Sequence, residues 1–336
     1  MTKETANEVP SRLVYVDIMK ALCIMLVIVG HMGFIEHNLK AWIYSFHIPV
    51  FFMITGLTFK KDEILSLRSY WNFVTRKFRS LMVPYALWAM IYASLSIGNL
   101  ARIAYGSHRS LIIAGGCSSL WFLPVMFLAV CFVDIMFYLL HYVRYRLFIL
   151  ICILTIGVGG GISIAFPTIE YGYPWGLDIS FCAAGFILMG FIFRTGIDNW
   201  PVVKRYSVMF AIFGGLGTLL YRFNIPDNGY VNMSERIYGQ WGGFIIVALF
   251  GGFFIWGLAM LFEKIEILAK GLGCIGRYSL IIFVIHRLLL SLFERFCDCF
   301  CITRGVEGIF TLMGTLFISC MIGIIVEKFA PVLCGK

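Results

Sequence analysis

Residues 15–34 read YVDIMKALCIMLVIVGHMGF, an apolar run that contains three ionisable side chains. A helix that crosses a bilayer needs about 20 mainly apolar residues, so this run predicts a membrane-spanning helix. Further runs of the same kind follow along the chain, at 42–59, 81–97, 120–140, 147–166, 179–193, 207–221, 241–262, 278–293 and 309–326. We therefore predict an all-α fold: a polytopic membrane protein with about ten transmembrane helices around a central cavity.

The composition excludes other protein classes. Of the 336 residues, 60% are hydrophobic and 13% are charged, whereas soluble domains carry about 25% charged residues. The mean hydropathy is +0.90. This surplus of apolar side chains excludes a soluble domain and a disordered chain. The net charge of +9 is typical of cytoplasmic Lys and Arg that fix membrane topology, so we expect the lipid bilayer and no nucleic acid as a partner.

The distribution of Lys and Arg predicts the orientation. If the N-terminus is cytoplasmic, most of these residues fall in loops on the cytoplasmic side, including the runs at 60–61, 76–79 and 204–205. The positive-inside rule then predicts that both termini are cytoplasmic. The connecting segments are too short for a separate soluble domain. We expect a single integral-membrane domain over 1–336, with a short cytoplasmic tail at 1–12.

The first predicted helix carries Asp17, Lys20 and His31, and ionisable groups inside a membrane are costly. Lys20 and His31 are separated by about 20° around the helix and about 16 Å along it. Asp17 is about 40° and about 21 Å from His31, on the same face but too far away to orient the imidazole. The orienting group is therefore expected on another helix. The alternative interpretation is a snorkelling lysine with a histidine that only packs.

Other polar residues give further candidates. His47 lies near the start of the second run, on the same side of the membrane as His31, and two imidazoles there suit proton transfer. A structural histidine bonded to a backbone carbonyl fits His47 equally well. His286, followed by Arg287, lies midway along the ninth run and lines a cavity or bonds between helices. The histidines at 37, 108 and 141 lie in predicted loops and are given no role.

Arg76 and Arg79 lie in a basic run before the third predicted helix. Such a run is usually a topology anchor or a lipid headgroup contact. The alternative interpretation is a phosphate-binding site, because a guanidinium group can bind two phosphate oxygens at once. The sequence contains no phosphate loop, no metal-binding motif and no nucleophile elbow, so we expect no metal.

A series of short motifs spans nearly the whole chain. They are DIMKA at 17–21, VGH at 29–31, FHIPVFFMITG at 46–56, RSLMVPY at 79–85, LWFL at 120–123, PWGLD at 174–178, and IGRYSL at 275–280 before His286. Their order and spacing resemble the acyltransferase 3 family, and within it the branch described as fucose 4-O-acetylase-like.

This resemblance implies a membrane O-acyltransferase that moves an acetyl group from cytoplasmic acetyl-CoA to a hydroxyl of a cell-envelope glycan or its lipid-linked precursor. It implies a bacterial cytoplasmic membrane and a role in polysaccharide biosynthesis. The family's catalytic histidine falls on His31, its preceding basic residue on Lys20, and its CoA-holding arginines on Arg76 and Arg79. Lys20 keeps the charge of the arginine that is frequent in the family but lacks the planar fork.

These expectations give a mechanism and its rivals. His31 takes the proton of the acceptor hydroxyl, which attacks the thioester directly; an acyl-His31 intermediate is a less favoured variant. Asp17, His47, Trp121, Asp178 and His286 are expected to line the cavity or contact substrate. One alternative is succinyl transfer to the same acceptors, with Arg287 as the added cation. Others are a non-enzymatic transporter of glycan precursors and a non-catalytic membrane module.

Overall fold

The computed structural model describes residues 13–59, 67–115, 118–139, 171–195, 205–224 and 230–336, with the single positions 147, 155, 157 and 161. Over these residues the chain is helical, and its one extended pairing is an isolated bridge between Asn232 and Ile237. The all-α prediction is therefore confirmed. The predicted helix at 147–166 lies almost wholly outside the described residues, so the number of ten spans stays a prediction.

Within the described residues, six helical segments are long and apolar enough to cross a membrane. They coincide with six of the predicted runs. These are Val14–His31 (α1), His37–Thr58 (α2, His37–Tyr44, with α3, His47–Thr58), Ser118–Leu139 (mostly α8, Phe122–Leu139), Pro174–Thr195 (mostly α10, Leu177–Thr195), Trp241–Phe262 (α13) and Arg304–Phe329 (α16). The chain is a multi-pass membrane protein, because an apolar face on so many long helices has no other stable surroundings.

Three further predicted runs are also helical, with shifted bounds. The run at 207–221 is α12, Ser207–Asn224, and the run at 278–293 is α15, Ser279–Cys299. The run at 81–97 belongs to a helix that begins earlier, because the polar α4 (Leu67–Lys77) continues through a π-helical turn into α5 (Val83–Tyr92). Three shorter helices connect the rest, α6 (Ile97–Tyr105), α7 (His108–Gly115) and α14 (Glu266–Arg277).

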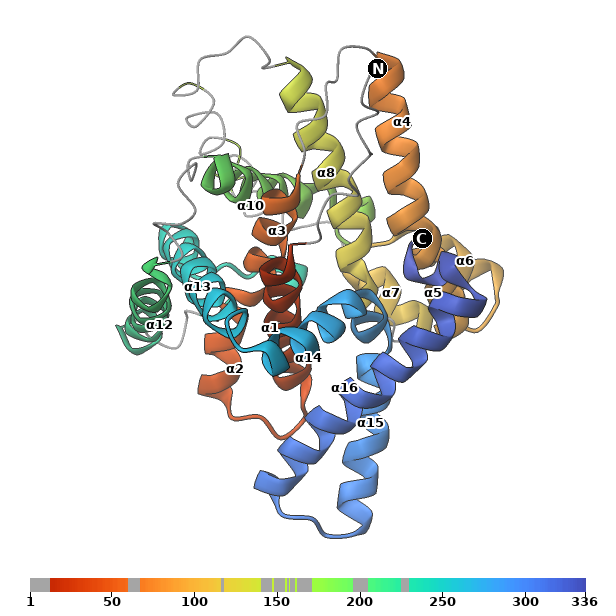
Figure 1. Cartoon of the computed structure of the whole chain (residues 1–336). Coiled ribbons are helices and arrows are strands. Elements are labelled where there is room, and N and C mark those ends of the chain that lie inside the picture. Colours follow the sequence, from red (N-terminus) through yellow and green to blue (C-terminus); the bar gives the residue numbers. More distant parts are fainter. Residues whose placement is uncertain are drawn as a thin grey trace, which may run out of the picture.

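Helix α1 occupies the centre of the molecule. It contacts α3, α13, α14 and α15, and Figure 1 shows it enclosed by these helices. Its side chains belong to both hydrophobic clusters of the protein, Ile24 and Ile28 to the larger one and Ile18 and Cys23 to the smaller one. The stripe that carries Lys20 and His31 is therefore surrounded by protein on most sides.

Close helix packing fixes the elements around α1. A Cβ atom at Gly56 of α3 would lie 1.9 Å from the carbonyl oxygen of Ile187, and one at Gly190 of α10 would lie 2.0 Å from that of Met53. Both glycines therefore let the two backbones touch, as small residues do in membrane helix pairs. This crossing holds α3, which lies beside α1, against α10.

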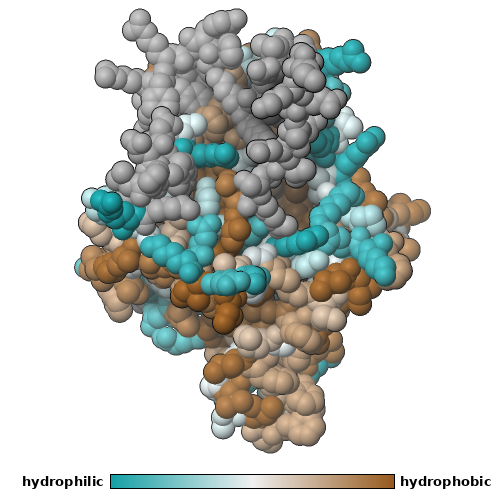
Figure 2. Space-filling model, viewed as in Figure 1, coloured by the Kyte–Doolittle hydropathy of each residue, from teal (hydrophilic) through white to brown (hydrophobic). Residues whose placement is uncertain are grey.

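Helices α15 and α16 form a hairpin that extends beyond the rest of the molecule (Figure 1). Its surface is largely hydrophobic (Figure 2), and its exposed side chains include Leu292, Phe296, Phe310, Met313 and Phe317. Exposed apolar patches of this size on a soluble protein would promote aggregation. In a membrane protein such a surface faces lipid.

Candidate active site

A polar cavity of about 240 Å³ lies at the end of α1 that carries His31. We call it the His31 cavity. It collects side chains from segments that are far apart in the sequence, and it is lined by His31, Lys40, Tyr44, His47, Ile48, His108, Ser118, Ser119, Trp121, Tyr230, Val231, Asn232, Met233, Ser234, Glu235 and Arg287. Three of the residues that the sequence suggested, His31, His47 and Trp121, are therefore in one cavity.

The imidazole of His31 is oriented by its own helix. Its Nδ1 lies 2.8 Å from the carbonyl oxygen of Val27, one turn earlier. A carbonyl oxygen only accepts hydrogen bonds, so Nδ1 carries a proton and the lone pair of the neutral ring lies on Nε2. The Tyr44 hydroxyl lies 3.4 Å from this Nε2. The expectation that another helix orients His31 was thus wrong, because the helical rotamer lets the ring reach a carbonyl four residues back.

His47 and His286 are held in the same way. Nδ1 of His47 lies 2.7 Å from the Ile43 carbonyl oxygen, and Nδ1 of His286 lies 2.6 Å from that of Phe283. The His286 ring is fully buried, and its centroid is 5.1 Å from that of His31. Among the described residues, Nε2 of His286 has no hydrogen-bond partner. The structure therefore brings a second imidazole, from α15, against the first.

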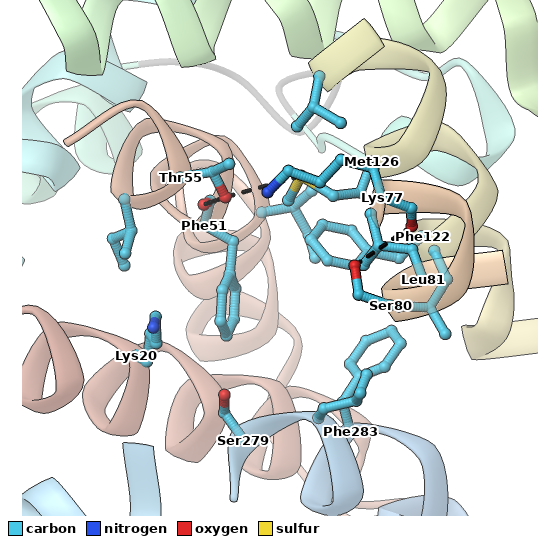
Figure 3. A pocket seen from close by; sticks show the side chains of 15 residues that line it. Lys20, Phe51, Thr55, Lys77, Ser80, Leu81, Phe122, Met126, Ser279 and Phe283 are labelled. Atoms are coloured by element: carbon cyan, nitrogen blue, oxygen red, sulfur yellow. Dashed lines mark hydrogen bonds between the residues drawn. The ribbon is translucent and has the colours of Figure 1, made fainter. Parts of the chain in front are cut away.

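At the other end of α1 is a second cavity, of about 220 Å³, which we call the Lys20 cavity. Its lining contains two charged groups, three hydroxyl groups and three aromatic rings. These belong to Lys20 and Lys77, to Thr55, Ser80 and Ser279, and to Phe51, Phe122 and Phe283. Figure 3 shows these side chains arranged around it, with Lys20 on α1 and Phe283 on α15. Asp17 lies 3.6 Å from the Lys20 ammonium and outside the lining of this cavity. Asp17 is therefore a partner that holds Lys20.

Arg76 and Arg79 line a third cavity, of about 720 Å³, which we call the Arg76 cavity. Lys336, from the far end of the chain, lines it too, with its ammonium paired to the Glu327 carboxylate. Arg79 belongs to the π-helical turn Phe78–Met82, a wide turn of a kind that is frequent at functional sites. The turn joins α4 to α5 without breaking the helix. The cationic character of this cavity suits phosphate groups.

The Lys20 cavity adjoins each of the other two cavities. Ser80 lines both the Arg76 cavity and the Lys20 cavity, and Ile48 lines both the Lys20 cavity and the His31 cavity. Aromatic rings separate the last two: the Phe122 ring is 5.3 Å from the Phe283 ring, and Trp121, its neighbour in sequence, faces the His31 cavity. A series of cavities therefore leads from the arginines of the Arg76 cavity, past Lys20 of α1, to the imidazole of His31.

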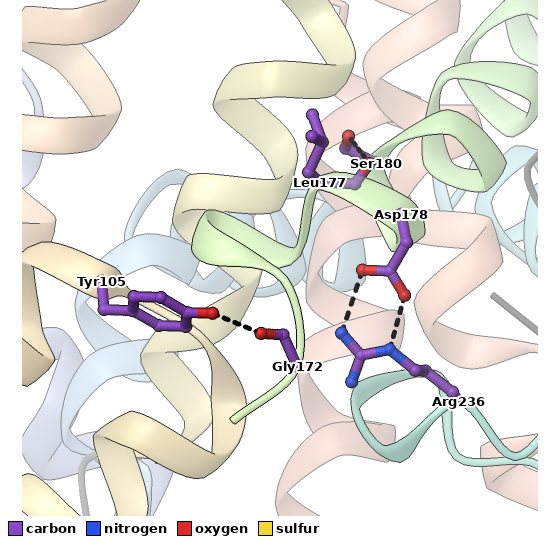
Figure 4. A network of polar contacts seen from close by, with 6 residues as sticks. All are labelled: Tyr105, Gly172, Leu177, Asp178, Ser180 and Arg236. Atoms are coloured by element: carbon purple, nitrogen blue, oxygen red, sulfur yellow. Dashed lines mark hydrogen bonds and ion pairs between the residues drawn. The ribbon is translucent and has the colours of Figure 1, made fainter. Parts of the chain in front are cut away.

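Asp178 lies outside the linings of these three cavities, in an ion pair. Nε of Arg236 lies 2.5 Å from Oδ2 of Asp178, and Nη2 lies 2.9 Å from Oδ1 (Figure 4). The carboxylate is buried in the first turn of α10, where the helix dipole favours a negative charge. Because residues 230–235 line the His31 cavity just before Arg236, this pair positions one wall of that cavity.

Sequence reasoning missed several lining residues. Tyr44 lies in the predicted run at 42–59 but was not singled out, and Lys40 lies just before that run. Tyr230 and Glu235 lie in the connection between the runs at 207–221 and 241–262, and His108 had been given no role. One signal was present: Tyr44 precedes His47 by three residues, so a helix places both on one face. For Lys40, His108, Tyr230 and Glu235, no neighbouring sequence pattern indicates that they lie near His31.

Comparison with known proteins gives one match. No curated protein and no solved structure is similar to this chain. The family model described as "Acyltransferase domain", of the acyltransferase 3 family, matches residues 13–326 and so includes α1 and all lining residues of the Lys20 and His31 cavities. Membership implies a membrane acyltransferase. The chain belongs to the acyltransferase 3 family.

Proposed function

We propose that this protein transfers an acetyl group from cytoplasmic acetyl-CoA to a hydroxyl of a cell-envelope glycan or its lipid-linked precursor, in the cytoplasmic membrane of a bacterium. The observation that carries the proposal is the series of adjoining cavities that runs from cations to the His31 imidazole. Both termini are cytoplasmic in this proposal, which places Arg76 and Lys336 on the side where CoA is made. The fucose 4-O-acetylase-like branch is the one whose motifs the chain resembles.

The donor would occupy two of the cavities. CoA carries several phosphates, which cannot enter the hydrocarbon core. Arg76 and Arg79 would bind these phosphates in the Arg76 cavity, and Lys20 and Lys77 are the cations of the adjoining cavity. The pantetheine arm is long and thin, and the mainly apolar Lys20 cavity suits it. The thioester would then lie beside Ile48 and Phe122, at the boundary with the His31 cavity.

The acceptor would occupy the His31 cavity, and the transfer would be direct. Nε2 of His31 takes the proton of the acceptor hydroxyl while the oxygen attacks the thioester carbonyl carbon. A C–O bond forms, the C–S bond breaks, and the CoA thiolate leaves and takes up the proton that His31 removed, which returns the imidazole to its neutral form. The Tyr44 hydroxyl, close to the same Nε2, would hold the ring or the acceptor. The products are an acetyl ester and CoA.

The other predicted residues would act around this centre. His286 packs against His31 and would hold the ring in place through its contact. His47 and Trp121 would form walls of the acceptor site. Asp17 would fix the Lys20 ammonium, and Asp178 would fix the wall that ends at Arg236.

Turnover of the donor tests the proposal. Purified protein in lipid nanodiscs is given acetyl-CoA labelled in the acetyl group, together with a lipid-linked glycan extract. We expect release of free CoA thiol and label in the glycan. A transporter of glycan precursors would neither bind nor consume acetyl-CoA, so the absence of both effects would reject the enzyme in favour of that rival.

One observation favours a second donor. Arg287 lines the His31 cavity, and a succinyl group would bring a carboxylate that could bind there. The same assay with succinyl-CoA separates the two donors. We favour acetyl transfer because Arg287 does not line the Lys20 cavity, through which the acyl group of the donor would arrive.

A further inference from the structure

Arg287 is a guanidinium group within the predicted membrane run at 278–293, in the apolar first half of α15. It follows His286 in α15, and its side chain is exposed and lines the His31 cavity. A charged side chain in a membrane-spanning segment is costly and is kept where it meets a functional site or a partner. The described residues provide Arg287 with one hydrogen-bond acceptor, Ser118 Oγ at 2.9 Å from Nη1. A guanidinium has five N–H donors, so further acceptors fit around it.

The cavity does not neutralise this charge with a paired carboxylate. Of the described residues, no Asp or Glu lies within 4.0 Å of Arg287, whereas Arg236 nearby forms its double contact with Asp178. The other charged groups of the lining are Lys40, whose ammonium is 5.6 Å from the centre of the Tyr44 ring, and Glu235. Two cations thus face one carboxylate.

His108 does not add to this charge. Burial, together with the cations Arg287 and Arg236, lowers the pKa of His108 to about 4, so its ring is neutral at physiological pH. The excess positive charge of the cavity therefore resides on Arg287 and Lys40. An excess of this kind within a membrane protein favours a ligand that carries a negative charge.

We propose that the acceptor carries an anionic group, a carboxylate or a phosphate, which Arg287 binds with Lys40 while the reacting hydroxyl lies at Nε2 of His31. This inference rests on the proposed acyltransferase function and adds the chemical class of the acceptor. A guanidinium binds both oxygens of such a group side by side, which fixes orientation as well as position. Because Arg287 and His31 line the same cavity of about 240 Å³, the anion and the reacting hydroxyl belong to one small acceptor.

The first experiment measures binding and needs no turnover. Protein in nanodiscs is titrated with methyl β-glucuronide and methyl β-glucoside, which differ in a carboxylate, and with glucose 6-phosphate and glucose, which differ in a phosphate. We expect at least one anionic probe to bind tenfold or more tightly than its neutral partner. The pair that shows the preference tells whether the group is a carboxylate or a phosphate. Equal affinity within both pairs would overturn the inference.

Variants of Arg287 test whether this residue causes the preference for the anionic probe. Arg287→Gln should reduce it to less than twofold, and Arg287→Lys should retain part of it, because the charge stays and the planar fork is lost. Arg295→Gln is the matched control, since Arg295 is exposed on the same helix and lies outside the cavity lining. Equal loss in the Arg295 variant would overturn the assignment to Arg287. Should the Gln variant fail to fold, the Lys variant decides, and an undiminished preference there would contradict bidentate binding.

A second experiment separates this inference from the proposed function. The four probes serve as acceptors with acetyl-CoA and with succinyl-CoA. Transfer to anionic and neutral sugars at equal rates would confirm the enzyme and reject the anionic acceptor. An Arg287-dependent preference for an anionic probe without any acyl transfer would support the anion site and reject the acyltransferase. An Arg287-dependent preference for succinyl-CoA, with no preference among the sugars, would assign the cation to the donor and overturn the inference.

Discussion

The sharpest prediction concerns the base at residue 31. In His31→Asn the amide nitrogen can take the place of Nδ1 and still donate to the Val27 carbonyl, while the group at Nε2 is lost. General base catalysis contributes about 10²- to 10⁴-fold to a rate, which is about 3–5 kcal/mol at 1.36 kcal/mol per tenfold. We therefore expect kcat to fall by about two to four orders of magnitude.

Binding of the donor and folding should change little in this variant. Lys20, the nearest cation on α1, is about 16 Å along the axis from residue 31, so the KM for acetyl-CoA should stay within about twofold. The retained hydrogen bond is worth about 0.5–1.5 kcal/mol, so its survival keeps the melting temperature close to that of the natural protein. A fall in kcat with an intact donor affinity would indicate lost chemistry and not lost structure.

The assay follows free CoA thiol in nanodiscs, with acetate in the glycan measured by mass spectrometry. His37→Asn is the matched control, because His37 is an exposed histidine that does not line the His31 cavity. It should change kcat by less than about twofold. Turnover at the natural rate in His31→Asn would refute the argument, and so would an equal loss in the His37 control.

Three more changes test other parts of the site. Arg76→Ala with Arg79→Ala should raise the Kd for CoA about tenfold or more, since a hydrogen bond to a charged group contributes about 1.5–3 kcal/mol; equilibrium binding measures it. Gly190→Ala should lower the melting temperature strongly, because its Cβ would lie 2.0 Å from a carbonyl oxygen and overpacking costs about 1–3 kcal/mol or more. Asp178→Asn should destabilise the protein by about 3–5 kcal/mol, because Arg236 keeps its charge without a partner; unfolding in denaturant shows it.

Each of these has a matched control and an opposing outcome. Arg68→Ala removes an exposed cation of α4, the helix that also carries Arg76, and should leave the Kd for CoA unchanged. If CoA binding weakened equally in this control, the basic run would be a topology anchor and not a CoA site. Gly271→Ala adds a Cβ that meets nothing within 4 Å, so a loss of stability there would contradict the packing argument. Adding Arg236→Met to Asp178→Asn should recover part of the stability, and no recovery would contradict the ion-pair explanation.

The sequence by itself determined the local features. The apolar runs specify the helices, because a segment in lipid must satisfy its backbone hydrogen bonds internally. The stripe of Lys20 and His31 follows from helix geometry alone, since both stand on one continuous helix. The family followed from short motifs in a fixed order. The sequence placed the start of the helix at 81–97 too late. The helix begins with α4, which continues into α5 but is too polar to resemble a membrane span.

Only the tertiary structure decided what surrounds His31. His286 and Arg287 come from a helix more than 200 residues away in sequence, and Lys336 reaches the Arg76 cavity from the other end of the chain. Such meetings depend on how helices cross, which glycine contacts such as that of Gly190 with α3 set, and no local pattern encodes them. The carbonyl that orients His31 is local, but its use depends on a side-chain rotamer that packing selects. A cavity exists only where several helices leave space between them, so its charge becomes visible only when they are assembled.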